Sequence, residues 1–345
     1  MSVPVLLLLT SIAPGAPPDG PVAGPPALTR GDRLPFAGEV TDEADAAGQV
    51  SRRAYALDVT LFVLDVADAY SDVAVFTQLT RKSDPGVVAA AANVMGTTPD
   101  AGATAAVSRL ELVRIDKRGR VVRLTPPNRP SFKFGPESPV AVLPAVPLDA
   151  PPTIELGMFV PLPDIPATVG ATWAVADGDR PARAITVRGT DVRNGGQCLA
   201  VEGVQQSTGW TDLAKVAAGW RRADRLTVSP VDGMARTVTR IIVHREGKAA
   251  VRTITIRYDA KPAVPHPGLS YWDARAEIGT AAWLAAELDK VLPGGKPDPA
   301  AVERVRERAK AFVDDRPATA FRPAVDAVRL RADAILAGRA LADGK

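Results

Sequence analysis

Hydrophobic and polar positions alternate with a period of two through most of residues 34–258. The run YALDVTLFVLDV at 55–66 is the clearest, because one face collects Tyr55, Leu57, Val59, Leu61 and Val63. VAVFTQLT, SRLELVRID and VVRLT follow, with polar breaks and a KRGR turn between them. Alternating runs joined by short turns are typical of antiparallel hairpins, so residues 31–125 are predicted to form a first β-rich half.

A second β-rich half is predicted at residues 169–262, after a proline-rich crossover at 126–168. Proline donates no hydrogen bond to a sheet, so the crossover is expected to hold only short strands, around 154–160. The second half alternates again, with an NGG turn before QCLAVEGVQQS and a DGM turn before ARTVTRIIV. Similar turns and strand starts in the two halves lead to the hypothesis of an internal duplication.

After Pro265 the hydrophobic period becomes helical, so residues 263–345 are predicted to form a helical region. Asp298 and Pro299 are expected to cap and start the middle helix. The three apolar stripes consist of Tyr271, Ala274, Ile278, Ala281, Ala285 and Leu288; Val302, Val305, Ala309 and Phe312; and Val325, Val328, Ala332 and Ile335. Each stripe occupies one side only, which favours a small bundle or hairpin packed on the sheet. A docking surface near Trp272 and Trp283 is the alternative.

These patterns define the predicted fold class as α+β. It is predominantly antiparallel β, in two curved sheets or half-barrels, followed by a C-terminal helical segment.

Residues 1–30 are interpreted as a signal peptide and a flexible Pro/Gly-rich linker. Val3 to Ala13 form an apolar run with the length of a signal-peptide core, too short to span a bilayer. This predicts export to the periplasm or cell envelope, with no transmembrane helix in the mature chain. No cysteine follows the run, so we do not expect a lipoprotein.

Charge excludes little except nucleic-acid binding. Lys and Arg number 42 against 39 Asp and Glu, a net charge of +3, and the two signs are mixed along the chain. The densest basic stretch, WRRADR, holds Arg221, Arg222 and Arg225. We interpret it as a solvent-facing surface or strand entry rather than as a phosphate or nucleic-acid site.

The candidate reactive side chains favour structural roles. Cys198 is the only cysteine, and the start of a strand offers neither a helix N-terminus nor a cationic neighbour to lower its pKa. It is therefore predicted to be a buried structural residue, with alternation placing it on the face opposite Leu199. His244 shares a strand face with Arg236, Val238, Arg240 and Ile242, and we interpret this face as mixed and half-exposed. His266 is expected in a turn.

No catalytic, cofactor-binding or metal-binding residue is nominated. The nucleophile elbow, the P-loop, the dinucleotide-binding glycine motif and HExxH are all absent from the sequence. Asp65, Asp68 and Asp72 lack the EF-hand spacing, although their oxygens leave a loop calcium site open. A carboxylate pair formed in space stays open as well.

The VGATW, NGGQC and VDGMA segments together resemble the strand–turn pattern of exported bacterial β-rich proteins. The resemblance covers about residues 30–260 and implies a curved sheet or half-barrel of the lipoprotein-carrier-like or lipocalin-like kind. It carries over no catalytic residue.

The leading functional hypothesis is a non-enzymatic exported envelope protein whose curved sheet binds an apolar small molecule or an envelope protein partner. An empty apolar cavity would favour a carrier, and a filled core would favour a scaffold. One alternative is a hydrolase with a carboxylate-based site in a sheet cleft, together with His244. Another is an interaction module acting through the C-terminal helices. No cofactor is expected, and the oligomeric state is left open.

Overall fold

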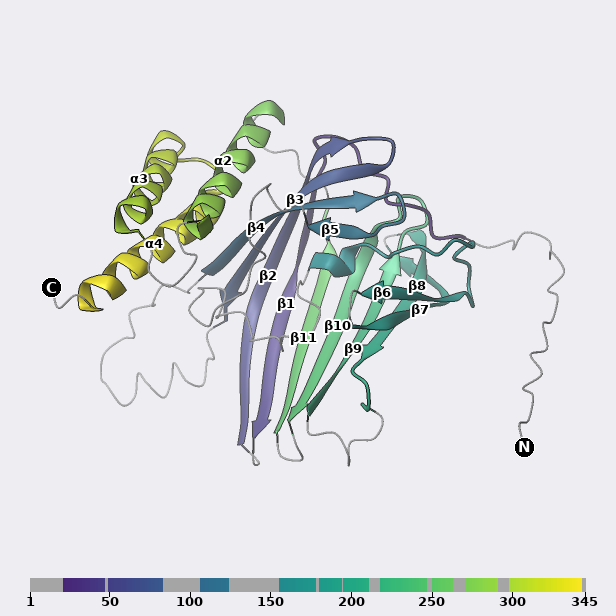
Figure 1. Ribbon diagram of the computed structural model, residues 1–345. Helices are drawn as coiled ribbons and strands as arrows, with labels where there is room; N and C mark the ends of the chain where they lie inside the picture. The colour runs from purple at the N-terminus through teal and green to yellow at the C-terminus, as the bar shows by residue number, and fades with distance from the viewer. Residues whose placement is uncertain are drawn as a thin grey trace, which may run out of the picture.

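The computed structural model describes residues 21–46, 49–82, 106–123, 155–177, 180–193, 195–210, 218–246, 250–262, 271–290 and 298–342. Within these ranges the chain forms one antiparallel sheet followed by helices (Figure 1). The predicted α+β fold class is confirmed. His266 and the N-terminal apolar run lie outside the described residues.

The described strands make a single eleven-stranded sheet in the order β5-β4-β3-β2-β1-β11-β10-β9-β8-β7-β6. The two β-rich stretches lie in one sheet rather than two because β1 pairs with β11 along its length, from Phe36–Ala260 to Ala46–Ala250. The strands are β1 Arg33–Ala46, β2 Gln49–Val66, β3 Tyr70–Arg81, β4 Ala106–Asp116, β5 Val121–Arg123, β6 Thr172–Asp177, β7 Arg180–Arg193, β8 Gly196–Gln206, β9 Ala218–Val228, β10 Ala235–Glu246 and β11 Ala250–Ala260.

The sheet buries a different core on each face. We call the face that carries Leu57, Val59 and Leu61 the inner face, and the opposite one, with Phe62 and Ala74, the outer face. Strand β4 contributes to both cores, because Val113 and Ile115 belong to the inner core while Leu110 and Leu112 pack against the outer core. Val113, which interrupts the alternation in the sequence, is thus an inner-face residue of a strand covered on both sides.

Helices α2 (Tyr271–Lys290), α3 (Pro299–Asp315) and α4 (Arg322–Ala342) cover the outer face over β2, β3 and β4 (Figure 1). Asp298 caps α3 by accepting a hydrogen bond from Ala300 N, with proline in the first turn, as predicted. The three predicted stripes pack together against the sheet, and Phe321 meets Phe76 edge-on. None of the described helices has the length and apolarity needed to cross a membrane.

The crossover enters the inner face as a 3-10 helix, η2 (Glu155–Met158), followed by an extended segment. The prediction of short strands around 154–160 was wrong, since beyond η2 only a single bridge from Phe159 to Met234 is formed. Met158, Phe159 and Val160 are buried in the inner core. Prolines at 161, 163 and 166 deny the segment the donors that a strand would need.

The N-terminal linker also contributes to the inner core. Residues 21–30 hold no helix or strand, which agrees with the sequence interpretation. However, Ala23 and Leu28 are buried there, and Ala23 N donates to the carbonyl of Ala167. This part of the predicted flexible linker is therefore packed rather than free.

Candidate ligand-binding site

A cleft of about 520 Å³ lies where the two edges of the curved sheet approach each other. Edge strand β5 contributes Val121, and edge strand β6 contributes Trp173 and Val175. Phe159 and Leu162, from the segment after η2, add further apolar surface. The cleft is therefore walled by both ends of the strand order and by the crossover.

Residues 159–164, which we call the strap, tie the two edges together. Leu162 N donates to the carbonyl of Arg118, in the turn before β5, at 2.7 Å. On the other side the indole N–H of Trp173 donates to the carbonyl of Pro161 at 2.8 Å. Arg118 and Asp164 also form an ion pair. The strap thus supplies polar links that strand pairing does not make between β5 and β6.

The floor of the cleft is polar. Arg183, Gln205 and Arg222 reach it from three neighbouring strands, β7, β8 and β9. Gln205 lies opposite Arg222 in the sheet register, and its amide donates to the carbonyl of Pro181 at 2.8 Å. A charged and polar floor beneath apolar walls distinguishes this cleft from the rest of the inner face.

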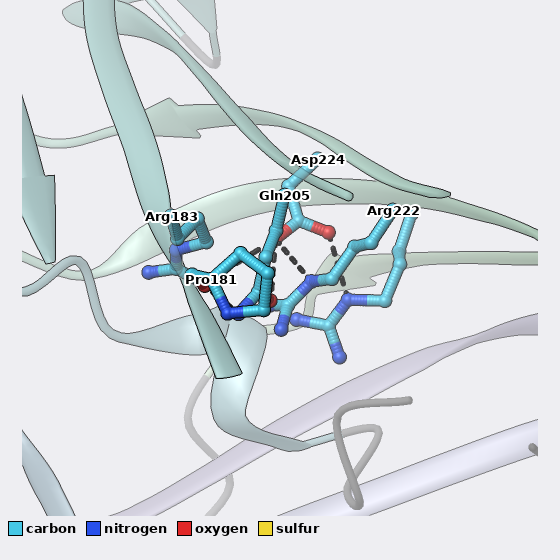
Figure 2. A network of polar contacts seen from close by, with 6 residues as sticks. Pro181, Arg183, Gln205, Arg222 and Asp224 are labelled. Atoms are coloured by element: carbon cyan, nitrogen blue, oxygen red, sulfur yellow. Dashed lines mark hydrogen bonds and ion pairs between the residues drawn. The ribbon is translucent and has the colours of Figure 1, made fainter. Parts of the chain in front are cut away.

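Asp224 anchors this floor, as Figure 2 shows. Its Oδ2 accepts from Arg222 Nε at 2.8 Å and lies 3.4 Å from Arg183 Nη1. Its Oδ1 accepts from Arg240 Nε at 2.8 Å. Asp224, Arg222 and Arg240 are all at most 4 % exposed. Among the described side chains, three arginines therefore share one buried carboxylate.

Burial and charge act in opposite directions on Asp224. Burial favours its neutral form, but the positive charges of Arg222 and Arg240, the hydrogen bond from Arg222 and the charge of Arg183 outweigh burial and hold its pKa well below the usual range. For Arg222, burial and then the charge of Arg240 lower the pKa to about 10. Asp224 is thus ionised at neutral pH and unsuited to donate a proton.

Two expectations about these residues need correction. WRRADR is not a solvated surface throughout, because Arg222 and Asp224 point to the inner face while Arg221 and Arg225 are exposed. The β10 face of His244 is half-exposed at Arg236 and His244, as expected, but Val238, Arg240 and Ile242 between them are buried. Arg222 and Arg240 can be buried because both pair with Asp224, which lies on the strand of Arg222 and on the strand next to Arg240.

The candidate reactive residues Cys198 and His244 lie apart in the sheet. Cys198 is 3 % exposed, and it alternates with Leu199 and Val201 of the inner core, as predicted. Burial raises the pKa of its thiol, an effect that the positive charge of Arg236 only partly opposes. His244 lies on the inner-face side of β10, opposite Trp220 and Arg252. The two side chains therefore occupy different faces of the sheet.

Two of the three acidic residues considered for calcium, Asp65 and Asp72, bind arginines instead. Asp65 forms an ion pair with Arg30, and Asp72 binds Arg114 through both oxygens. Across the described part of the chain, no group of three or more His, Cys, Asp or Glu side chains is placed to hold a metal ion.

Comparisons with known proteins give only distant likenesses. No protein-family model and no curated protein matches the chain. Among solved structures, a DUF1329 family protein from Desulfovibrio piger is 9 % identical, covering 69 % of this chain and 88 % of its own, with a TM-score of 0.16. DynF, from the dynemicin biosynthesis pathway of Micromonospora chersina, is 9 % identical, covering 77 % and 94 %, with a TM-score of 0.20.

A third similar structure is a putative outer membrane lipoprotein-sorting protein domain from Vibrio parahaemolyticus. It is 8 % identical, covering 68 % of this chain and 87 % of its own, with a TM-score of 0.15. TM-scores this low carry no argument about function, so the site is interpreted from its own geometry.

Sequence reasoning missed the group formed by Arg183, Arg222 and Arg240 around Asp224, which we call the arginine cluster. The available signal was an arginine at an inner-facing position between apolar residues, as in Val238, Arg240 and Ile242. The cleft could not be predicted from any local sequence pattern, because its walls come from segments that are far apart in the chain.

Proposed function

We propose that the protein is a non-catalytic binding protein that holds a small molecule in the cleft between its two sheet edges. The observation that carries the proposal is a 520 Å³ cleft that combines apolar side chains on its walls with a polar and charged floor. Sites for small molecules commonly occupy roughly 300–1,000 Å³ and combine apolar walls with a few placed polar groups.

The proposed ligand site lies beside the inner core rather than in its middle. Met158, Phe159 and Val160 fill the space over the central strands, and the residues they contact are buried. The sheet is therefore both a packed scaffold and the wall of a binding cleft. This combines the two outcomes that the sequence left open.

The hydrolase alternative finds little support in this geometry. Of the described residues that line the cleft, Asp164 is the only carboxylate, and it is paired with Arg118. Asp224, behind the floor, is held ionised by arginines. A general acid needs a pKa near the working pH, and the arginines around Asp224 hold its pKa far below that.

The interaction-module alternative relied on exposed apolar stripes. Those stripes are buried against one another and against the outer face. Trp272 and Trp283 stay exposed on α2, each with an arginine near its ring, Arg275 and Arg308 respectively. Two isolated aromatic residues are ordinary on a protein surface.

Export remains part of the proposal, on the strength of the apolar run Val3 to Ala13. Mass measurement of the protein recovered from the envelope fraction tests it. A chain shortened by a peptide ending near Ala13 is expected, and a full-length cytoplasmic chain would contradict export.

Blocking the cleft tests the binding proposal. Val175→Trp places a large ring at the β6 wall, whereas Val192→Trp makes the same change at a residue that is 70 % exposed. Each protein is purified from a host with a full lipid complement and extracted under denaturing conditions for mass spectrometry. A small molecule is expected with the wild type and Val192→Trp but not with Val175→Trp. Equal recovery from both variants would contradict the proposal.

A further inference from the structure

We propose that the ligand is an amphiphile with one anionic headgroup, a carboxylate or a phosphate, which binds Arg222 and Arg183 at the floor of the cleft. This inference rests on the proposed function and specifies the ligand class for the same site. It depends on three features of the cleft: the buried guanidinium of Arg222, the way Asp224 is shared, and the apolar walls.

Arg222 is the main reason to expect an anion. Its side chain is 5 % exposed, yet it lines the cleft. Its Nη2 lies 2.6 Å from Asp224 Oδ2, but among the described residues this atom has no partner in hydrogen-bond geometry. The ion pair with Asp224 leaves these N–H groups poorly directed, so a further acceptor in the cleft would be stabilising.

Asp224 interacts with several arginines at once. Arg222 and Arg183 both approach Oδ2, while Arg240 binds Oδ1. A guanidinium offers five N–H donors in a planar fork, and Oδ2 of Asp224 cannot accept from all five N–H groups of Arg222. Planar forks of this kind suit carboxylate and phosphate oxygens.

Electrostatics at Arg222 supports the same ligand chemistry. Burial and the neighbouring positive charge of Arg240 lower the pKa of Arg222 to about 10, which means that its charged form is disfavoured there. An anion in the cleft would stabilise the charged form of Arg222. The site is partly desolvated, and attraction between opposite charges is stronger there than in water.

The walls indicate that the rest of the ligand is apolar. Phe159, Leu162 and Trp173 line the cleft above the arginines. The indole N–H of Trp173 is already donated to Pro161, which leaves its ring as apolar surface. Arg120 and Asp164 also line the cleft, but an acyl chain or a fused ring would be buried against these three apolar side chains.

Titration with matched probes separates the headgroup from the apolar body. Laurate, dodecyl phosphate and dodecanol share the same chain, and only the first two carry an anion. Each is titrated by calorimetry into the full chain, as the wild type and as Arg183→Gln, Arg222→Lys and Arg225→Gln. Arg225, on β9 with a 79 % exposed side chain, is the control.

Laurate and dodecyl phosphate are expected to bind at least about tenfold more tightly than dodecanol, the preference of a charge-assisted hydrogen bond. Arg183→Gln should abolish most of this preference and Arg225→Gln none of it. Arg222→Lys keeps a buried positive charge, and a reduced preference in this variant supports the fork geometry. The stronger binder of the two anions distinguishes a carboxylate from a phosphate site.

Equal affinity for dodecanol and both anions, or an equal loss in Arg225→Gln, would overturn the inference while leaving the proposed function standing. If none of the three probes binds the wild type, the proposed function fails together with the inference. If Arg183→Gln retains the full preference, the anion does not lie at this floor and the inference fails.

Discussion

At the scale of single residues, Asp224 has the largest influence on the polar floor. It lies on the inner face and is the shared partner of Arg183, Arg222 and Arg240. Strand alternation in the sequence placed Arg240 on one face with Val238 and Ile242, whereas the stretch around Arg222 was interpreted as a solvent-facing surface. It did not reveal their burial, because that depends on pairing between β9 and β10.

Asp224→Asn should therefore destabilise the fold by about 3–5 kcal/mol, because it leaves buried guanidinium groups without their counter-charge. Urea denaturation measures the change. Asp191→Asn is the matched control, since Asp191 pairs with Arg193 at the surface, where such a pair contributes about 1 kcal/mol or less. Similar losses in both variants would contradict the account of the floor.

The contribution of Asp224 should also depend on pH. Its folded pKa is depressed below that of an ordinary aspartate, about 3.9, so its stabilisation is complete above that value and is lost as the pH falls towards the folded pKa. The stability difference between wild type and Asp224→Asn should shrink as the pH falls from about 5 to about 2. A difference that stays constant across this range would contradict the assigned charge state.

Cys198 should behave as a protected core thiol. Burial raises its pKa and leaves its side chain 3 % exposed, so both the thiolate and access to it are limited. Labelling by a thiol reagent at mildly alkaline pH should be roughly a hundredfold slower in the native protein than in urea. Equally fast labelling in the two states would show that this strand is open to solvent.

At the scale of elements, the sequence predicted the strands and helices better than the crossover. Period-two and helical patterns are local, and they identified the inner face of β2 and all three helical stripes. The strap has neither pattern. Its conformation is set by contacts with Arg118, Trp173 and Met234, which lie on separate elements.

Gly157 fits η2 closely against the arginine cluster. A Cβ at this position would lie 2.6 Å from Arg240 Nη2 and 3.0 Å from the Tyr258 hydroxyl. Gly157→Ala should therefore cost about 1–3 kcal/mol in thermal or urea unfolding, because both neighbours are buried. Gly189→Ala is the control, since a Cβ there meets nothing within 4 Å. If both variants are as stable as the wild type, η2 is not packed on the cluster.

The helices should be energetically part of the sheet domain. Phe321 is buried and meets Phe76 of β3 with ring centroids 5.9 Å apart. Phe321→Ala should destabilise by about 3–5 kcal/mol and lower the single unfolding transition of sheet and helices together. Leu330→Ala, at a position 61 % exposed on α4, should change little. A separate early transition of the helices alone would contradict this coupling.

At the scale of the whole molecule, one curved sheet has its ends joined by the strap rather than by strand pairing. The β1–β11 ladder unites the two β-rich stretches into one curved sheet (Figure 1). Its edge strands β5 and β6 line the same cleft. The sequence predicted the curvature and two β-rich stretches but not their union, because strands this far apart in the chain pair through contacts that no local pattern records. The cleft follows from that union.

The central claim is that this cleft binds the anionic group of an amphiphile, and a crystal structure of the protein with laurate tests it most directly. We predict density for the carboxylate within hydrogen-bond distance of the Arg222 guanidinium, with the chain lying along Phe159, Leu162 and Trp173. Laurate bound elsewhere, or an empty cleft at a concentration that saturates binding in solution, would contradict the account.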